Sequence, residues 1–558
     1  MALSSEYEVV LAVDGMTCTA CERRVEQALT QAGARNPRAN WRSRTVTFRM
    51  PADADLERFR RAVAAAGGSR HHYVPGEARM RPLPGAGGTA PVSEPADVDF
   101  VILGSGSAAF AAAIEARQLG ASVVMIERGT IGGTCVNIGC VPSKFLLRAA
   151  EVAHEARTSP YQAVVSRLEG IDLAAHVAQK RALIAELRRE KYEDLIAFYG
   201  WELIRGEGRF VDGQTVEVNG LRIRARAILI ATGAQPAVPP IPGLRDVPFL
   251  TSTTALDLDH IPASLAILGA GYVALELGQA FQRLGSAVTL IQRRPRLLPE
   301  AEPELASALQ QALEAEGMRF ALGSHVLQIE RVGAGVRLTL NQSGHTETIE
   351  ADALLVATGR QPNTDQLNLR AAGVAVDDRG APAHDATLRT TNPRVYVAGD
   401  VTLGPQFVYV AAYEGRLAAR NALLGEARPA DLSTVPAVIF TSPQVASVGQ
   451  TRAQAETAGY SVVSGFAPAA VIARERVNLQ PYGGVLVVAD ADSEQILGVH
   501  AVATAAGELI EAATLAVVHR LTLDDLRNHL SPYLTSSEGL RLAALAVTQD
   551  VARLSCCA

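Results

Sequence analysis

Hydrophobic and polar residues alternate in two stretches near the start of the chain, and each of these is followed by a stretch with helical spacing. Period-two alternation is typical of half-buried strands, whereas apolar residues three and four apart are typical of amphipathic helices. This order predicts a small α/β module over residues 1–71. Its strands are expected at residues 8–13 and 44–49, and its helices at residues 21–31 and 56–66.

Proline and glycine become frequent between residues 74 and 97. A stretch of this composition buries too little apolar surface to order itself. We therefore expect a flexible linker over residues 72–97, in preference to a chance run of these residues between packed elements.

A strand, a glycine-rich turn and a helix follow one another after residue 98, and the same pattern recurs near residue 265. Two such units indicate two nucleotide-binding domains. After residue 430 the glycine turns stop, and strands at 485–489 and 496–503 mix with helices, as in a separate domain. The predicted boundaries are 98–245 and 371–430 for the first nucleotide-binding domain, 246–370 for the second, and 431–558 for the C-terminal domain.

The first glycine turn has the sequence GSGSAA at residues 104–109. Gly104 permits a tight turn, Gly106 lets a pyrophosphate approach the backbone, and Ala109 replaces the third glycine where the helix packs on the strand. The next strand ends at Glu127, 23 residues after Gly104, where a carboxylate can bind both hydroxyls of an adenosine ribose. A surface glutamate that follows a glycine turn is the alternative.

The second glycine turn has the sequence GAGYVA, and its corresponding positions are Gly269, Gly271 and Ala274. The residue that matches Glu127 is Gln292, and Arg293 and Arg294 follow it. Loss of the carboxylate removes repulsion with a 2′-phosphate, and guanidinium groups bind such a dianion well. This pattern favours NADP(H) over NAD(H), unless the arginines belong only to a solvated loop.

The overall charge and hydropathy narrow the class of protein. With a net charge of −6 and a pI of about 6.1, the chain lacks the basic surface that nucleic acid or an anionic membrane requires. No apolar run reaches the roughly 18 residues of a membrane span. The first residues carry Glu6 and Glu8 and lack a signal-peptide pattern, so we expect a cytoplasmic protein.

All six cysteines fall into three close pairs, which in a long chain indicates thiol chemistry or soft-metal binding. In the central pair, four residues separate Cys135 from Cys140, a spacing that allows a disulfide across one helical turn. Glycines precede this pair and Pro142 follows it, so we expect a turn that enters a helix. A helix N-terminus lowers the pKa of a thiol and favours exchange chemistry. The other pairs are Cys18 with Cys21 and Cys556 with Cys557.

The segment GTCVNIGCVPSK at residues 133–144 resembles the active-site signature of the flavoprotein disulfide reductases. This family includes dihydrolipoamide dehydrogenase, glutathione reductase and mercuric reductase. Further stretches resemble the same family in the same order, and the resemblance covers residues 98–558. They are ATG at 231–233, ATGR at 357–360 and VYVAGD at 395–400.

The resemblance implies FAD in the first nucleotide-binding domain, NADPH in the second, and a homodimer formed through the C-terminal domain. It also implies that Lys144 lies beside the isoalloxazine ring with Glu276 as its partner. Cys140 would face the flavin and Cys135 the substrate. Further FAD contacts implied by the family are Gly129, Thr134, Gly208, Asp400 and Val408.

The stretch HLSPYLTSSE at residues 529–538 bears on the substrate. Family members that act on thiols carry a histidine directly before the proline, where it transfers protons. Here His529 lies three residues before Pro532, which counts against such a substrate. Mercuric reductases instead resemble this chain in the PYLT stretch. That resemblance implies Hg(II) as substrate, with Tyr533 and Tyr192 beside the metal, although each tyrosine could instead be a core residue.

The cysteine pairs near the two ends of the chain favour a soft metal ion as the substrate. Adjacent thiolates of Cys556 and Cys557 near the end of the chain can capture such an ion. By the resemblance they would pass it to Cys135 and Cys140 of the partner subunit; an incidental tail or a vicinal disulfide are the alternatives. The stretch GMTCTAC at residues 15–21 resembles the heavy-metal-associated domain, in which Cys18 and Cys21 bind metal. A thioredoxin-like motif is the alternative there.

These observations predict an α/β protein with two Rossmann-like three-layer domains and an α+β C-terminal dimerisation domain. A βαββαβ ferredoxin-like metal-binding domain is expected at the N-terminus. The expected activity is reduction of Hg(II) by NADPH through FAD and a redox-active dithiol. The rivals are a related reductase with a thiol or disulfide substrate, and a soft-metal trafficking protein with an inactive reductase core.

Overall fold

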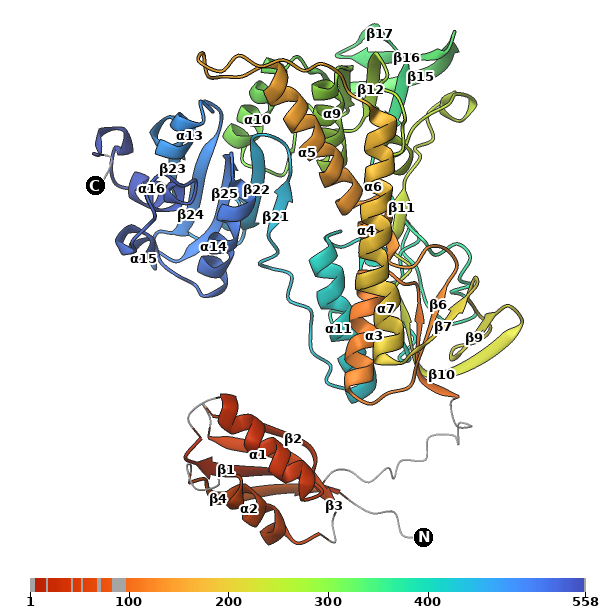
Figure 1. Ribbon diagram of the computed structural model, residues 1–558, viewed down its shortest axis with the longest axis vertical. Helices are drawn as coiled ribbons and strands as arrows, with labels where there is room; N and C mark the ends of the chain where they lie inside the picture. Colours follow the sequence, from red (N-terminus) through yellow and green to blue (C-terminus); the bar gives the residue numbers. More distant parts are fainter. Residues whose placement is uncertain are drawn as a thin grey trace. The chain divides into compact units, whose positions relative to one another are not determined.

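A computed structural model describes residues 6–16, 19–41, 44–51, 54–67, 72–82 and 97–555. The chain divides into two compact units, Met1–Pro95 and Ala96–Ala558 (Figure 1). Within the described residues, no helix is both long enough and apolar enough to cross a membrane.

The N-terminal unit is an antiparallel sheet in the order β2-β3-β1-β4 with two helices. The alternation seen in the sequence sets its core, because Val9, Leu11 and Val13 of β1 are buried and Val10 points outward. Phe48 of β3 packs on Phe59 of α2, with ring centroids 5.1 Å apart. The predicted βαββαβ fold is present: β1 (Glu6–Asp14), α1 (Thr19–Gln31), β2 (Arg35–Asn40), β3 (Thr45–Pro51), α2 (Leu56–Ala65) and β4 (Val74–Pro82).

Strand β4 corrects the predicted linker, which was expected to begin at residue 72. Tyr7 to Asp14 of β1 pair with residues 82 to 74 of β4 in antiparallel register. The backbone hydrogen bonds to β1 offset the entropic cost of ordering a segment that contains Pro75, Gly76 and Pro82. Strand β4 lies at the edge of the sheet, where proline is tolerated. The linker prediction was therefore wrong for residues 74–82, and its remainder lies outside the described residues apart from residues 72–73 and 97.

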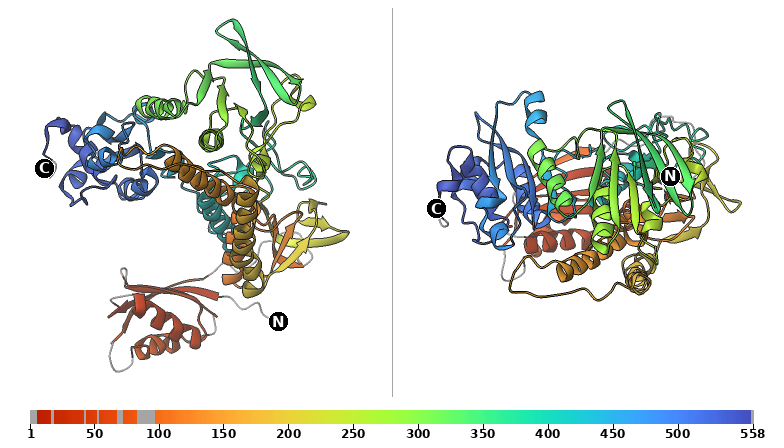
Figure 2. Two further views of the ribbon diagram at one scale, coloured as in Figure 1. Left: turned by 45° about the horizontal axis from the view of Figure 1, so that its top comes forward. Right: turned by 90° about the horizontal axis from the view of Figure 1, so that it is seen from above.

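The second unit begins with a mainly parallel sheet in the order β7-β6-β5-β10-β9-β8, to which β20 adds beside β10. Strand β20 comes from far down the chain, so this sheet is assembled from two separate segments. Helices α3 and α11 pack together on one face of the sheet (Figures 1 and 2). The elements are β5 (Val98–Leu103), α3 (Ser107–Gln118), β6 (Val123–Glu127), α4 (Gly133–Ile138), α5 (Cys140–Arg157), α6 (Leu173–Arg188), η1 (Arg189–Glu193), α7 (Asp194–Tyr199), β7 (Glu202–Arg205), β8 (Arg209–Phe210), β9 (Thr215–Val218), β10 (Leu221–Ile230), β20 (Val395–Val397), η3 (Asp400–Thr402) and α11 (Val408–Leu424).

The second glycine turn lies in a parallel sheet in the order β14-β13-β12-β18. An outlying antiparallel sheet, β15-β16-β17, extends from it (Figure 2). A short pair, β11 with β19, joins this part of the chain to the first sheet. The elements are β11 (Ala234–Pro236), η2 (Leu244–Asp246), α8 (Ser252–Ala255), β12 (Ser264–Leu268), α9 (Tyr272–Leu284), β13 (Ala287–Gln292), α10 (Pro303–Ala315), β14 (Arg319–Leu322), β15 (Ser324–Val332), β16 (Gly335–Gln342), β17 (His345–Ala351), β18 (Ala353–Val356) and β19 (Arg360–Pro362).

The C-terminal part is a five-stranded antiparallel sheet in the order β21-β22-β25-β24-β23. Strands β24 and β25 coincide with the two strands predicted there. The helices α14 and α16 cover this sheet and share its core. The elements are β21 (Ala437–Ile439), β22 (Gln444–Gly449), α12 (Arg452–Thr457), β23 (Val462–Pro468), η4 (Ala469–Val471), α13 (Ala473–Val477), β24 (Gly484–Asp490), β25 (Ile496–Ala503), α14 (Ala506–Val518), α15 (Leu523–Asn528), α16 (Glu538–Ala546) and η5 (Val551–Arg553). The domain boundaries within residues 98–558 stay predictions.

Candidate active site

The first glycine turn has a backbone that only glycine adopts easily. Gly104 has a φ of +109°, and a Cβ there would lie 2.4 Å from the carbonyl oxygen of Ala231. Gly106 is the N-cap of α3, so the free amides at the start of that helix face the turn. Ala109 is fully buried where α3 packs on the sheet. The turn therefore has the tight backbone and the open helix start that the predicted pyrophosphate site requires.

Glu127 stands at the end of β6, as expected for a ribose-binding carboxylate. Its Oε2 accepts a hydrogen bond from the Ser105 hydroxyl at 2.6 Å, and its Oε1 accepts one from the Gly129 amide at 2.5 Å. Gly208 lies buried against this corner, and with Gly104 and Glu127 it lines a small hollow of about 220 Å³. The carboxylate is thus oriented by groups on both sides.

The second glycine turn repeats the geometry of the first. Gly269 has a φ of +107°, and its Cβ would lie 2.4 Å from the carbonyl oxygen of Ala357. Gly271 caps α9, and a Cβ on it would meet nothing within 4 Å. Ala274 is fully buried. A pyrophosphate could therefore approach this helix start as well.

The two arginines predicted to bind a 2′-phosphate, Arg293 and Arg294, have different surroundings in the structure. The Gln292 side chain accepts a hydrogen bond from the Arg293 amide at 2.9 Å, and both residues line the central cavity. Arg294 forms an ion pair with Glu300 at 3.7 Å and does not line that cavity. Ser324 also lines it, and among the described residues its buried hydroxyl has no partner. Arg293 is therefore better placed than Arg294 to bind a 2′-phosphate in the cavity.

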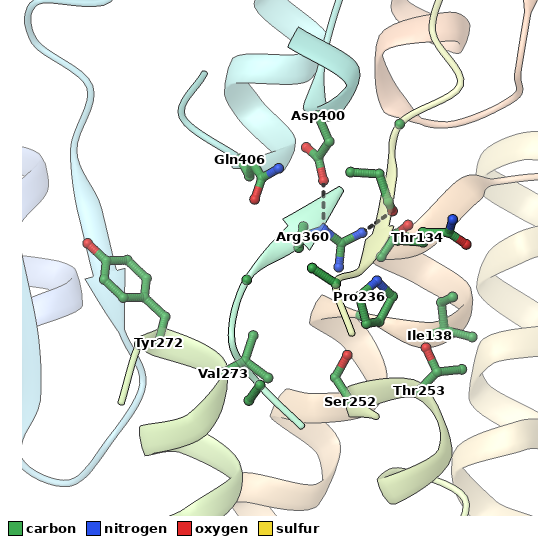
Figure 3. A pocket seen from close by; sticks show the side chains of 18 of the residues that line it. Thr134, Ile138, Pro236, Ser252, Thr253, Tyr272, Val273, Arg360, Asp400 and Gln406 are labelled. Carbon is green, nitrogen blue, oxygen red and sulfur yellow. Dashed lines mark hydrogen bonds and ion pairs between the residues drawn. The ribbon is translucent and has the colours of Figure 1, made fainter. Parts of the chain in front are cut away.

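A single cavity of about 1970 Å³ connects both glycine turns and the central cysteine pair. Figure 3 shows part of its wall, with Ser252 and Thr253 on one side and Tyr272 and Val273 on another. Of the residues predicted from the sequence, it is lined by Gly104, Gly106, Glu127, Gly129, Thr134, Cys135, Cys140, Lys144, Gly269, Gly271, Glu276, Arg293, Asp400 and Val408. Residues from both nucleotide-binding halves thus share one chamber.

The central cysteines lie on two successive helices. Cys135 is in α4, and Cys140 is the first residue of α5. Gly139 separates the two helices with a non-helical backbone of φ −128° and ψ −109°, and a Cβ there would lie 2.9 Å from the carbonyl oxygen of Thr134. The expected entry into a helix is present, because Cys140 begins α5. Both thiols are reduced in the structure.

The entry to α4 presses against the first glycine turn. Gly133 has a φ of +64°, and a Cβ on it would lie 2.6 Å from the Cα of Gly106. The Asn137 side chain secures the same loop, since its amide donates to the carbonyls of Ile131 and Gly133, each at 2.9 Å. The cysteine-bearing helix and the predicted pyrophosphate turn are consequently in direct backbone contact.

The pKa values of the two thiols are shifted in opposite directions. A hydrogen bond from the Cys135 thiol to the Cys140 sulfur, assisted by the charge of Lys144, lowers the pKa of Cys140 to about 7, although burial and Glu276 act against this. The same hydrogen bond, followed by burial, raises the pKa of Cys135. The position of Cys140 at the start of α5 also favours a thiolate. Cys140 is therefore the more acidic thiol of the pair.

Lys144 reaches its predicted partner. Its ammonium donates to Oε2 of Glu276 at 2.8 Å and lies 4.5 Å from the ring centroid of Phe440. The other Glu276 oxygen accepts from the backbone amide of Phe440 at 2.9 Å. Helices α5 and α9 and the end of β21 therefore meet at one carboxylate, which fixes the lysine inside the cavity.

Asp400 lies opposite, at the start of η3, where burial raises its pKa although Arg360 lowers it. The Arg360 guanidinium is 3.6 Å from the Asp400 carboxylate and also donates to the carbonyl of Ala234 (Figure 3). Val408 begins α11 at the cavity wall. Behind them, the buried Glu414 carboxylate accepts the amide of Gly399 at 2.6 Å.

Tyr192 lies in η1, a single π-helical turn, a form that often occurs at functional sites. Its ring meets the edge of Phe110 with centroids 4.8 Å apart, and a Cβ on Gly132 would lie 3.3 Å from it. Burial raises the pKa of its phenol, although a hydrogen bond with Ser107 lowers it. The structure thus brings Tyr192 beside the loop that leads to Cys135.

Tyr533 is not brought to the cavity of its own chain. It lies between α15 and α16 and is 49% exposed, outside the residues that line the cavity. His529 bonds through Nδ1 to the carbonyl of Leu526 at 2.8 Å. Cys21 is buried in the N-terminal unit. Cys18, Cys556 and Cys557 lie outside the described residues.

Some residues of the site were not singled out in the sequence. Arg360 follows the second ATG motif, so its position beside a recurring turn was an available signal. Ser105 lies within the first glycine turn and could have been inferred from the need to orient Glu127. Phe440 and Glu414 carry no local signal, because only the packing of distant segments brings them to the site.

Known proteins match this chain over nearly its whole length. Residues 98–415 match the pyridine nucleotide-disulphide oxidoreductase family, residues 435–544 its dimerisation domain, and residues 10–69 the heavy-metal-associated domain. A mercuric reductase of Staphylococcus aureus is 46% identical over 546 residues, covering 98% of each chain. One of Bacillus cereus is 48% identical over 551 residues, covering 98% of this chain and 86% of the relative.

A solved structure extends the likeness to the fold. The Cu(II) complex of the HOCl-induced flavoprotein disulfide reductase RclA from Escherichia coli has a TM-score of 0.72 at 31% identity. It covers 81% of this chain and 100% of that one. With the two glycine turns, the reduced cysteine pair and the Lys144–Glu276 ion pair in one cavity, these matches show that the chain belongs to the pyridine nucleotide-disulphide oxidoreductase family.

Proposed function

We propose that this protein is a mercuric reductase, which reduces Hg(II) to elemental mercury at the Cys135–Cys140 dithiol. The observation that carries the proposal is that this dithiol opens into one cavity with both nucleotide-binding turns. The substrate is inferred from the relatives named mercuric reductase, which are 46% and 48% identical over 98% of the chain. The histidine expected of a thiol-substrate enzyme is displaced to His529, which argues against the rival substrates.

The first turn fits FAD. Gly104, Gly106 and Gly133 form a cradle that a Cβ would fill, and Glu127 offers an oriented carboxylate for a ribose. The buried hydroxyl of Thr232, which lines the same cavity, has no partner within the described part of the chain. Gly129, Thr134, Gly208, Asp400 and Val408 complete the proposed contacts.

The second turn fits NADPH. Gly269 and Gly271 leave the start of α9 open, and Gln292 in place of a carboxylate leaves room for a 2′-phosphate beside Arg293. When bound, NADPH would donate the two electrons and FAD would pass them on, so that Hg(II) and NADPH yield elemental mercury, NADP+ and a proton. The residues of this chain provide the positions at which that transfer is possible.

The dithiol itself captures the metal. A thiolate is the ligand that a soft cation prefers, and Cys140 has a pKa of about 7, so it is available at neutral pH. When the metal binds the Cys135 sulfur it displaces the thiol proton, and the metal–sulfur bond offsets the raised pKa of Cys135. Both sulfurs must be reduced first, because a disulfide cannot bind the ion. Lys144 places a positive charge close to Cys140 and would lie beside the ring of the flavin when FAD is bound.

The proposed roles of the tyrosines and of the terminal cysteines follow from this assignment. Tyr192 already lies beside the Cys135 loop and would contact the metal from its own chain. Tyr533 lies outside the cavity of its own chain, so it would serve the site of the partner subunit in a homodimer. Cys556 and Cys557 would deliver Hg(II) there by ligand exchange.

The N-terminal module would collect Hg(II) at Cys18 and Cys21, and the whole protein would work in the cytoplasm. The buried position of Cys21 at the start of α1 supports a site in which one thiol is shielded.

One experiment tests the assignment. The purified protein should oxidise NADPH when Hg(II) is added in excess thiol, and Cys135→Ala should abolish this oxidation. The same variant should still bind FAD and lose its yellow colour with NADPH, because both turns remain intact. Full Hg(II)-dependent turnover in Cys135→Ala would rule out the proposed site, whereas failure of the native protein to oxidise NADPH with Hg(II) would rule out the substrate.

A further inference from the structure

A fully buried carboxylate lies in the C-terminal part of the chain, away from the cavity. Glu475 of α13 is 0% exposed. Its Oε2 accepts hydrogen bonds from the Thr504 amide at 3.0 Å and the Thr504 hydroxyl at 2.6 Å. Its Oε1 accepts one from the Ser536 hydroxyl at 2.6 Å. A buried carboxylate is costly unless its oxygens are satisfied, and here three neutral donors satisfy them.

The link to Ser536 leads directly to the segment that carries Tyr533. Ser536 is 5% exposed, whereas Leu530 and Tyr533, a few residues earlier, are 98% and 49% exposed. The segment is therefore anchored at one end and projects at the other. Because the anchor and the projecting tip are only three residues apart, the backbone between them has little freedom once Ser536 is held.

Other contacts hold the same segment in one shape. Leu534 has a φ of +61°, a left-handed conformation that costs energy in a branched residue and needs support from its surroundings. The Thr535 hydroxyl donates to the carbonyl of Pro532 at 2.9 Å. Next to the anchor, Gly539 has no room for a side chain, since a Cβ would lie 2.6 Å from Val485. The segment is thus strained at its tip and tightly packed at its base.

We propose that Glu475 is a positioning residue that, through Ser536, holds the 532–535 segment so that Tyr533 presents its phenol to the metal site of the partner subunit. This inference rests on the proposed role of Tyr533. The anchor is built from α13, the end of β25 and the start of α16, so a rigid sheet supports the projecting tyrosine. A satisfied buried network of this kind favours a single conformation over several.

The variants that test this act on the two sides of Glu475. Ser536→Ala removes the link to the segment and leaves both bonds to Thr504. Thr504→Val removes one bond on the far side and leaves the Ser536 link, so it is the matched control. Glu475→Gln should retain most function, because its carbonyl can accept from Thr504 and its amide can donate to the Ser536 hydroxyl.

We expect Ser536→Ala to lower kcat for Hg(II) reduction by about ten-fold, as loss of a hydrogen bond to a charged group can. Thr504→Val should change kcat little at a similar melting temperature. Reduction of the bound flavin by NADPH should be unchanged in both. In Tyr533→Phe, which should itself lower kcat, adding Ser536→Ala should have almost no further effect, since coupled residues are not additive.

Three results would overturn the inference. If Ser536→Ala lowers kcat equally in the native and Tyr533→Phe backgrounds, the network acts on stability and not through Tyr533. If Ser536→Ala has no effect while Tyr533→Phe does, the anchor does not position the tyrosine. If Tyr533→Phe alone has no effect, the proposed role of Tyr533 fails, while loss of turnover in Cys135→Ala would still uphold the proposed reductase. Hydrogen exchange of the 530–537 peptide, faster in Ser536→Ala than in Thr504→Val, gives a readout without turnover.

Discussion

The Lys144 ammonium donates to the Glu276 carboxylate at 2.8 Å, although 132 residues separate the two in the chain. The carboxylate also accepts the amide of Phe440, so three distant segments fix the position of one cation. Glu276 is buried, and Lys144 is partly exposed to the cavity. This arrangement holds a positive charge close to the Cys140 sulfur, where it acts on the chemistry of the thiol.

Lys144→Met should therefore raise the pKa of Cys140 above its value of about 7, by roughly one unit, because an adjacent cation favours the thiolate. The thiolate is present above the pKa and is lost as the pH falls through it, so the titration should move to higher pH. Ultraviolet absorbance of the reduced protein measures this directly. Arg148→Met, which removes an exposed cation one turn along α5, should leave the titration in place; an equal shift would contradict the prediction.

Gly133→Ala should lower the amount of FAD that copurifies with the protein. The new Cβ would lie 2.6 Å from the Cα of Gly106, so the first glycine turn or α4 must move. Gly120→Ala is the matched control, because Gly120 also has a positive φ, of +81°, but its Cβ would meet nothing within 4 Å. Both variants incur about 1–2 kcal/mol of backbone strain, and only Gly133→Ala should lose FAD. Equal FAD content in the two would count against the close contact.

Arg293→Ala should raise the KM for NADPH by about ten-fold or more and leave the KM for NADH nearly unchanged, since a charge-assisted hydrogen bond to phosphate is lost. Arg294→Ala should have a smaller effect, because that side chain pairs with Glu300 and does not line the cavity. Steady-state kinetics with each nucleotide measure the difference. A larger effect at Arg294 would reverse this assignment.

Glu414→Gln should change how stability depends on pH. Burial, with a further contribution from Asp400, raises the pKa of Glu414 to about 7, although the Gly399 amide lowers it. The folded protein then binds a proton that the unfolded chain releases, so native stability falls as the pH rises from 4.5 towards 7. Glutamine keeps an acceptor for Gly399 without this penalty.

Relative to the native protein, the stability of Glu414→Gln should therefore increase by about 3 kcal/mol between pH 5 and pH 8. Apparent melting temperatures across that range measure the trend. Asp385→Asn is the control, because the pKa of Asp385 is lowered from 3.8, so both states carry the charged carboxylate above pH 5 and its variant should show no slope over that range. A Glu414→Gln difference that is independent of pH would contradict the raised pKa.

Removal of residues 1–97 should leave most Hg(II)-dependent turnover intact in vitro. The N-terminal residues form a compact unit of their own, and the cavity is lined only by residues of the second unit. Turnover per bound FAD should be compared with that of the full chain, using Hg(II) in excess small-molecule thiol. A large loss at equal FAD content would show that the first module takes part in the reaction itself.

Local sequence predicted the parts of the site that depend on local backbone. Gly104 and Gly269 each lie between a buried strand and the helix that starts three residues later, so both turns could be predicted from neighbouring residues alone. The Lys144–Glu276 pair was expected only through the family resemblance, since nothing near either residue indicates the other. Residues such as Glu414 and Glu475 could not be predicted, because their partners come from segments brought close by folding.

Composition misled where tertiary pairing outweighed it. Residues 74–82 carry the prolines and glycine of a linker, yet they form β4 because β1 has a free edge there. The end of α4 at Gly139 was not predicted, because glycine adopts both helical and non-helical backbone conformations.

Strand β20 has a consequence for biosynthesis. It pairs with β10 in the middle of the first sheet, and α11 comes after it to cover α3, yet both are encoded after the entire second glycine-turn unit. On the ribosome, where the chain emerges in order, residues 264–356 can pack before the earlier segment is complete. The first sheet must therefore remain without β20 until residue 397 has left the exit tunnel, and during that interval the end of β10 lacks the strand that pairs with residues 228–230.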